Sequence, residues 1–448
     1  MLRWHIEHSK GIVSILACLM MIVASLSACA QGMSSGNTFA NPNHPITIGF
    51  SISTTGDFKD DSTATEQGYQ LWANSVNSTG GLLGRQVVLK ILHDNSTEVA
   101  VRANYEQLIS KDRVDLVFGP FSSLLTAQAE PVALQYHYAF LEGSGGAPSI
   151  FDNRWPNLFD VSLPVANNLI TFAYYILSLP PDQRPKRAAY LSSDDPFTFP
   201  QVDVVRTLLS KAGVETVYPT AAKAVLPQDD KTLNNLPPGY QMFNEGINST
   251  NSTIAADADL VARSGADVAI LGTILPDITA EIAEFKKLKY NPKAIIFTAG
   301  PDSGQAFIKE VGGIHYTEGF FVPNGWYPQA TTYQNAEMVQ AYLAQYGGTE
   351  DQINANAAEA FSVGQVLQQA AEKINSIDNA KLITELQSGD VFNTVQGTAQ
   401  FSAAGSLDMG QNRQAVAYLF QWQGGQFLPV FPYSNAAENP EYPRPKYF

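Results

Sequence analysis

The sequence predicts an α/β protein with two doubly wound parallel sheets, and three observations lead to that prediction. After residue 45, short β-branched apolar runs alternate with stretches of helical periodicity, which is the order of a parallel sheet covered by helices. The alternation stops near Pro164 and begins again at Arg187, which indicates a second unit of the same kind. The length of 448 residues also exceeds what a single hydrophobic core usually supports.

In the first unit, β-branched runs predict four strands with helices between them. We place the strands at 46–50, 87–92, 114–118 and 139–142, and the helices at 63–76, 99–109 and 124–134. The second unit repeats this order. We place its strands at 187–191, 266–271 and 294–298, its helices at 202–209 and 278–288, and a later helix at 356–374. The polar stretch 225–253 is longer than ordinary connections and predicts a surface excursion.

Composition and charge exclude several classes of function. The net charge of −15 argues against nucleic-acid binding, which usually requires a basic face. The six histidines are scattered without metal-ligand spacing, and the only G-x-S-x-G match, at 32–36, lacks the strand–turn–helix context of a catalytic serine. Phosphate-binding glycine motifs are also missing. We therefore predict a protein that is not an enzyme and needs no metal or cofactor.

The first residues predict an export signal followed by a lipid anchor. A weakly basic start precedes an apolar run at 11–25 that is too short for a comfortable membrane span. Cys29 follows Leu-Ser-Ala and resembles the cysteine of the bacterial lipobox, whose thiol receives diacylglycerol before the chain is cleaved just in front of it, here removing residues 1–28. The alternative is a plain secretory signal with a chance cysteine. Residues 29–45 are polar and predict a flexible tether that leaves the protein outside the cytoplasm, anchored to a membrane.

An ordered set of segments resembles the type I periplasmic solute-binding proteins of ABC importers, the leucine/isoleucine/valine-binding and amide-binding receptors. The set contains ITIGFSISTTGDFKD, GGLLGRQVVLKILHDNST, VDLVFGPFSS, EGSGGAPSIFDN, FTAGPD and EAFSVGQVLQQA. The resemblance implies two lobes joined by three crossover strands, with limits at 46–163 plus 323–410 and at 164–322 plus 411–448. It also implies a monomer that closes on a small amino-acid-like ligand and delivers it to a membrane permease.

Ser122 and Ser123 are the first candidate ligand-binding residues. Together with Phe121 they follow a predicted strand and open a helix, where free N–H groups and the helix dipole favour an anion. The alternative is that the serines only cap the helix. In the family this segment holds the carboxylate of the ligand, so the resemblance favours a binding role for all three residues.

Further candidates follow the neighbouring strands, because open α/β sheets bind ligands beyond the carboxyl ends of their strands. Gly143, Gly145 and Gly146 would let the backbone approach a ligand, although the family often has alanine and threonine where this chain has the last two. Asp302 matches an acidic residue that meets the ligand ammonium in amino-acid receptors, or it is an ordinary turn residue. Glu142 is a competing acid at a strand end.

Three aromatic residues are expected near the same cleft. Phe197 stands where the family has an aromatic residue from the second lobe, and Phe58 and Trp326 lie close to the expected cleft. An aromatic face can pack against an apolar side chain or a cation, and the alternative for each, which is the commoner case for a lone aromatic residue, is a place in the core.

The function predicted from these features is that of a transport receptor for an amino acid, an amide or a related small solute. Because one scaffold serves many functions, two alternatives stay open. The first is a ligand-sensing module that acts on a signalling partner without transport. The second is an extracellular hydrolase, which the lack of a recognisable triad disfavours.

Overall fold

The computed structural model describes residues 44–219, 245–246 and 251–446. The described residues from Pro45 onward belong to one compact unit. The predicted signal peptide, Cys29, most of the predicted tether and most of the polar stretch 225–253 lie outside the described residues. Within the described ranges, no helix is both long enough and apolar enough to cross a bilayer.

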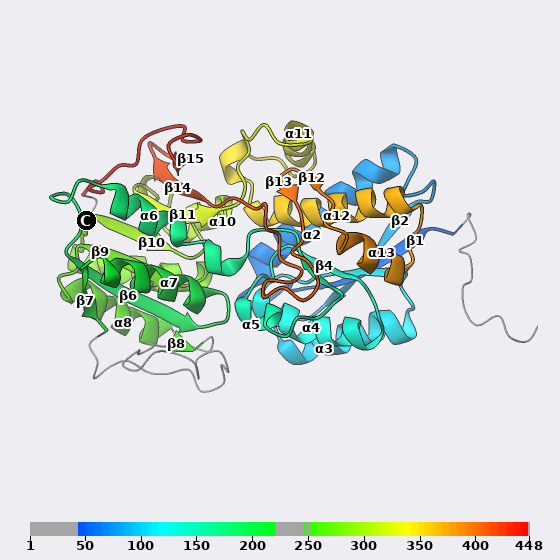
Figure 1. Cartoon of the computed structure of the whole chain (residues 1–448). Coiled ribbons are helices and arrows are strands. Elements are labelled where there is room, and N and C mark those ends of the chain that lie inside the picture. The colour runs from blue at the N-terminus through cyan, green and yellow to red at the C-terminus, as the bar shows by residue number, and fades with distance from the viewer. Residues whose placement is uncertain (1–43, 220–244, 247–250, 447–448) are drawn as a thin grey trace, which may run out of the picture. The chain divides into compact units, whose positions relative to one another are not determined.

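The first sheet contains five parallel strands in the order β2-β1-β3-β4-β5 (Figure 1). Their bounds are β1 (Ile46–Ile52), β2 (Val87–His93), β3 (Leu116–Phe118), β4 (Phe140–Glu142) and β5 (Leu158–Asp160). Side chains alternate between the two faces, so Leu116 and Phe118 enter one core and Val117 enters the other. Both faces are buried, which explains why these strands read as near-continuous apolar runs in the sequence. The sequence did not predict β5.

Helices from two distant parts of the chain cover this sheet. One group follows the strands directly: α2 (Lys59–Ser78), α3 (Glu98–Glu106), a π-helical turn at Gln107–Lys111, α4 (Ser123–Gln135) and α5 (Pro148–Phe151). The other returns late in the chain: α11 (Asn335–Tyr346), α12 (Ala355–Ile374), α13 (Asn379–Leu386) and the hairpin of β12 (Phe392–Thr394) and β13 (Gly397–Ala399). Helix α12 packs closely on α2, where Gly68 and Gly364 leave no room for a side chain. The late segment thereby completes the first lobe.

The second sheet has the order β15-β14-β11-β10-β9-β6-β7, with β8 beside β6. Its strands are β6 (Arg187–Asp194), β7 (Glu215–Tyr218), β8 (Glu245–Gly246), β9 (Val268–Gly272), β10 (Ala294–Phe297), β11 (Phe320–Asn324), β14 (Tyr418–Gln423) and β15 (Gln426–Phe431). Strands β6 to β11 pair in parallel, whereas β14 is antiparallel to β11 and β15 is antiparallel to β14. Only β6, β9 and β10 were predicted from the sequence.

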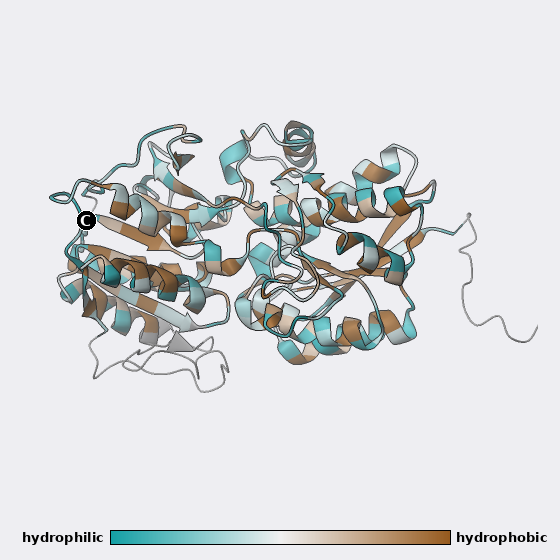
Figure 2. Cartoon of the chain, in the orientation of Figure 1, coloured by the Kyte–Doolittle hydropathy of each residue, from teal (hydrophilic) through white to brown (hydrophobic). Residues whose placement is uncertain are grey.

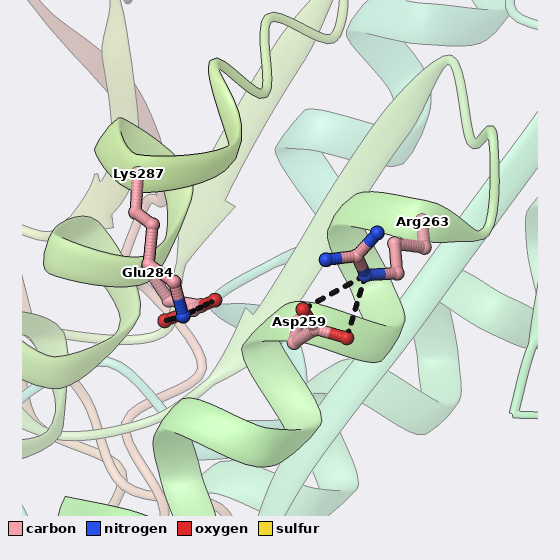
Figure 3. Close-up of polar contacts among 4 residues, drawn as sticks. All are labelled: Asp259, Arg263, Glu284 and Lys287. Carbon is pink, nitrogen blue, oxygen red and sulfur yellow. Dashed lines mark hydrogen bonds and ion pairs between the residues drawn. The ribbon is translucent and has the colours of Figure 1, made fainter.

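The second sheet also lies between two helical layers, and Figure 2 shows its strands as apolar between helices with polar outer faces. The helices are α6 (Ile170–Ser178), α7 (Thr198–Lys211), α8 (Asn251–Arg263), α9 (Leu275–Leu288) and α10 (Gln305–Glu310). On α8 and α9, which pack together, Arg263 pairs with Asp259 and Lys287 pairs with Glu284, each at 2.8 Å (Figure 3). Ion pairs with one exposed partner stabilise a protein by only about 0.2–1 kcal/mol, so burial of the apolar faces holds these helices.

The chain passes between the two sheets three times: after β5, after β11 and before β14. The predicted fold of two α/β lobes with parallel sheets is therefore confirmed. The residue limits that we expected for the lobes stay a prediction.

Candidate functional site

The candidate site is a cavity of about 80 Å³ at the carboxyl ends of strands from both sheets. Its walls include residues that directly follow β3, β4, β6, β9 and β10, together with the end of β11. This is the place where open α/β sheets bind their ligands. This volume is several times the roughly 10–15 Å³ that a cavity needs to hold one water molecule. Its size suits a small organic molecule rather than a peptide.

Ser122 and Ser123 both line the cavity, and their hydroxyl groups have different surroundings. Ser122 has a left-handed φ of 88°, and its Oγ accepts a long hydrogen bond of 3.4 Å from the N–H of Leu125 at the start of α4. Ser123 is fully buried, and its Oγ has no hydrogen-bond partner among the described residues. The capping role therefore belongs to Ser122, and the Ser123 hydroxyl is a buried polar group without a partner at the wall of the cavity.

The glycine loop after β4 brings the backbone to the wall of the cavity. Gly143 and Gly146 line the cavity, whereas Gly145 does not. A Cβ at Gly145 would lie 2.5 Å from the Thr126 hydroxyl, and one at Gly146 would lie 2.6 Å from Oδ2 of Asp160. Larger residues, such as those the family often has here, would collide with these side chains. The Gly145 N–H donates a short hydrogen bond to Glu142, which is therefore buried behind the loop.

Asp302 lines the cavity and also closes a turn, so the two roles considered for it coexist. Its Oδ1 accepts a hydrogen bond of 2.9 Å from the Gly300 N–H. Burial, with a further contribution from the charge of Asp61, raises the pKa of Asp302 to about 7. Asp61 itself lies in the first turn of α2 and lines the same cavity.

Asp61 links the two lobes at the edge of the cavity. Its Oδ1 accepts one hydrogen bond from Ser303 Oγ at 3.1 Å and another from Asn354 Nδ2 at 2.7 Å. Ser303 follows β10 in the second lobe, whereas Asp61 and Asn354 belong to the first. Burial raises the pKa of Asp61, and these two hydrogen bonds oppose the rise.

Glu359 contributes a third carboxyl group from the first turns of α12. Its Oε2 accepts a hydrogen bond of 2.9 Å from Ser144 Oγ in the glycine loop. Burial raises the pKa of Glu359 to about 8, and the charges of Asp302, Asp160 and Asp61 add to the rise. The cavity thus combines one free hydroxyl group with several carboxyl groups of raised pKa.

Aromatic rings form part of the wall. Phe58, Phe121 and Phe197 line the cavity, and the rings of the first two meet edge to face with their centres 5.8 Å apart. Trp326 does not line it: the indole is 2% exposed in the core of the first lobe and donates from Nε1 to Asn335 at 2.7 Å.

Sequence reasoning missed Asp61, Ser144, Asn356 and Glu359, all of which line the cavity. A weak sequence signal existed for the last two. Asn356 and Glu359 are polar residues one turn apart at the start of an otherwise apolar helix, a spacing that puts both on one face. No comparable signal marks Asp61, which stands among other polar residues.

Comparisons with known proteins agree with this architecture. The profile of a family described as periplasmic binding protein matches residues 45–230 and 250–426. Among solved structures, the chain is similar to the branched-chain amino acid transporter substrate-binding protein LivJ from Streptococcus pneumoniae in complex with isoleucine. The identity is 15% and the TM-score 0.68, over 90% of this chain and 100% of that one.

Two further solved structures extend the likeness. A leucine-binding protein LivK from Thermotoga maritima has 15% identity and a TM-score of 0.67, over 85% of this chain and 97% of that one. A solute-binding protein of an ABC transporter from R. palustris, in complex with benzoate, has 15% identity and a TM-score of 0.64, over 90% of this chain and 98% of that one. At such identities these structures show a shared fold and leave the ligand of this chain open.

Proposed function

Because the chain belongs to the periplasmic binding protein family, whose members are extracytoplasmic substrate-binding receptors, we propose that it is the receptor of an ABC importer. In this proposal it binds an amino acid, an amide or an aromatic acid between its lobes and delivers the ligand to permease subunits in the membrane. Binding shifts the population towards the closed form, because the ligand gains contacts with both lobes only there.

One observation carries the proposal: a single cavity joins the unpartnered hydroxyl of Ser123 to the carboxyl group of Asp302. Ser123 stands at the start of α4, where N–H groups and the helix dipole favour a ligand carboxylate. Asp302 comes from the second lobe and can form a charge-assisted hydrogen bond to a ligand ammonium. These two groups support a ligand that carries a carboxylate and an ammonium group close together, as an amino acid does.

A thermal-shift screen of the purified protein against amino acids, amides and small aromatic acids tests this function. A ligand present at a hundred times its Kd should stabilise the protein by about 2.7 kcal/mol. Hits should then be measured by calorimetry with the wild type and with Ser123→Ala and Asp302→Ala. Loss of affinity in both variants supports the site, and unchanged affinity in both would refute it.

Attachment to a membrane is a second part of the proposal, and it rests on the sequence around Cys29. A lipid on that thiol would anchor the protein through buried methylene groups, each contributing about 0.8 kcal/mol. We expect Cys29→Ser to release the protein from membranes in a fractionation experiment. Cys18→Ser is the matched control because Cys18 lies inside the apolar run, and it should leave attachment unchanged. A Cys29→Ser protein that stays on the membrane contradicts the anchor.

Delivery to a permease and a monomeric state complete the proposal. Deletion of the gene for this protein should abolish uptake of the ligand found in the screen by the cells that normally make it, while uptake of unrelated solutes continues. Light scattering of the purified protein, with and without ligand, should give the mass of one chain. Normal uptake in the deletion strain would instead favour a sensing role.

A further inference from the structure

The cavity carries charge of one sign. Asp61, Asp302 and Glu359 line it from α2, from the loop after β10 and from α12. None of the described residues that line it is a lysine or an arginine. Asp195 also lines the cavity, but its Oδ1 already accepts hydrogen bonds from the N–H groups at the start of α7.

Among the described residues that shift the pKa values of the three carboxyl groups, none is a lysine, an arginine or a histidine. Their hydrogen-bond donors are neutral: two serine hydroxyls, an asparagine amide and the backbone N–H of Gly300. The titratable groups coupled to them on neighbouring elements are three further carboxyl groups and a neutral phenol: Asp60 and Tyr69 on α2, Glu142 on β4 and Asp160 on β5. Asp61 is buried and Asp302 and Glu359 are half-buried, and carboxylates withdrawn from water in this way favour a positive partner or a proton.

Asp160 extends this acidic surface behind the glycine loop. Its Oδ2 is buried without a hydrogen-bond partner and lies 2.6 Å from the position that a Cβ on Gly146 would take. A metal ion is a poor candidate for the missing positive charge. In the part of the chain that the structure describes, no group of three or more histidine, cysteine, aspartate or glutamate side chains is arranged to hold one.

The unpartnered Ser123 hydroxyl is independent evidence that a ligand binds here. It is fully buried, belongs to the wall of the same cavity and stands at the N-terminal end of a 13-residue helix. This position suits an anionic group of the ligand. A ligand with one carboxylate and one ammonium would satisfy Ser123 and one carboxyl group, and would leave two carboxyl groups of the cavity without a cation.

We propose, resting on the function proposed above, that the site selects short diamino acids, which carry one carboxylate and two ammonium groups, over neutral amino acids and aromatic acids. The carboxylate binds at the Ser123 end, and the two ammonium groups share Asp61, Asp302 and Glu359. The small cavity volume of about 80 Å³ favours a diamino acid with a short side chain over one with a long side chain.

The binding of such a ligand is linked to proton release. The pKa values of Asp302 and Glu359 are raised to about 7 and about 8, so near neutral pH the empty cavity holds protons that a cation must displace. Affinity therefore rises with pH between 6 and 8, by up to about tenfold per pH unit for each proton released. A neutral amino acid, whose single ammonium displaces fewer protons, shows a shallower dependence.

Calorimetry on the purified full chain tests this inference with two isosteric pairs, L-2,4-diaminobutyrate against L-norvaline and L-ornithine against L-norleucine. In each pair the side-chain ammonium is replaced by a methyl group. We expect the diamino acid to bind at least tenfold more tightly at pH 8 and to lose at least tenfold in affinity at pH 6.

Two Glu→Gln substitutions test whether the preference for diamino acids depends on a carboxyl group in the wall of the cavity. Glu359→Gln should weaken diaminobutyrate binding at least tenfold and flatten its pH dependence, while norvaline binding changes less than twofold. Glu130→Gln removes a buried carboxyl of similar raised pKa that does not line the cavity, and it should change neither affinity by more than twofold. If Glu359→Gln does not fold, the wild type decides: the affinity for diaminobutyrate should rise more steeply between pH 6 and pH 8 than the affinity for norvaline, and equal slopes would overturn the inference.

The outcomes separate this inference from the proposed function. Norvaline, leucine or benzoate bound as tightly as diaminobutyrate would overturn the inference and leave the receptor function standing. Glu130→Gln weakening the diamino acid as much as Glu359→Gln would also overturn it. If the protein binds no amino acid, amide or aromatic acid, the proposed function itself fails.

Discussion

Glu130 provides a sharp test of how burial controls ionisation in this protein. It lies on α4 with no exposed surface, and neither of its carboxyl oxygens has a hydrogen-bond partner among the described residues. The amide group of Asn157 is close, but its Nδ2 donates to the Tyr138 carbonyl at 2.9 Å. Burial raises the pKa of Glu130 from 4.5 to about 8, and Asn157 opposes the rise only in part.

The size of the effect of Glu130→Gln follows from this pKa. Folding raises the pKa of Glu130, so the contribution of this group to the free energy of unfolding is fully present below pH 4.5. That contribution is lost as the pH rises through about 8. At pH 7 the unfolded side chain is ionised and the folded one is protonated. At about 1.4 kcal/mol per pH unit, this difference destabilises the wild type by about 3 kcal/mol. Glutamine does not titrate, so Glu130→Gln removes this pH-dependent loss of stability.

Urea denaturation of wild type and Glu130→Gln between pH 4 and pH 8 measures the difference. The two free energies of unfolding should agree within about 0.5 kcal/mol at pH 4 and diverge as the pH rises, with the variant about 3 kcal/mol more stable at pH 7. Glu372→Gln, at an exposed position of α12, is the control and should change stability by less than about 0.5 kcal/mol at every pH. A pH-independent difference for Glu130→Gln would refute the reasoning.

Three further substitutions test packing, the ligand end of the cavity and the contact between the lobes. In Gly68→Ala the new Cβ would lie 2.1 Å from the carbonyl oxygen of Ala357. This clash costs about 1–3 kcal/mol, which outweighs the gain of about 1 kcal/mol in helix propensity. We therefore expect urea denaturation to show a net loss of stability. Ser123→Ala should weaken ligand binding about five- to tenfold, as measured by calorimetry, without lowering the melting temperature. Ser122→Ala removes a helix cap and should lower the melting temperature. Ser303→Ala removes the hydrogen bond between the lobes and should speed ligand dissociation several-fold in stopped-flow measurements. An unchanged dissociation rate would show that this bond does not hold the closed form.

The sequence predicted those parts of the fold that local pattern determines. Runs such as 46–50 and 294–298 are β-branched or aromatic and buried on both faces of a parallel sheet, so they have the same appearance wherever they lie in the chain. Strands β14 and β15 were missed because they contain glutamine and proline on an antiparallel edge, where strand formation depends on the pairing of β14 with β11 and of β15 with β14. Strand β5 has three residues, too few for any periodicity to appear.

The candidate site, like the fold, was predictable from the sequence only where local pattern determines it. Ser122 and Ser123 follow a strand and begin a helix, and this local arrangement can be recognised from the sequence. Asp61 and Glu359 reach the cavity only because α12 returns to pack on α2, a contact between segments almost three hundred residues apart. Trp326 shows the reverse: its neighbours in sequence line the cavity, but the indole turns into the core to meet Asn335.

The distribution of the carboxyl groups connects ligand charge to closure. Asp61 and Glu359 belong to the first lobe and Asp302 to the second, so closing the lobes over an empty cavity brings like charges together. Either protons or a cationic ligand must neutralise the three carboxylates. A proton bound to a carboxylate of one lobe neutralises its charge without contacting the other lobe. An ammonium that reaches both lobes stabilises the closed form specifically, and a ligand shifts a conformational equilibrium only through such a difference in affinity. The same carboxyl groups that would select a cationic ligand would therefore couple its binding to closure.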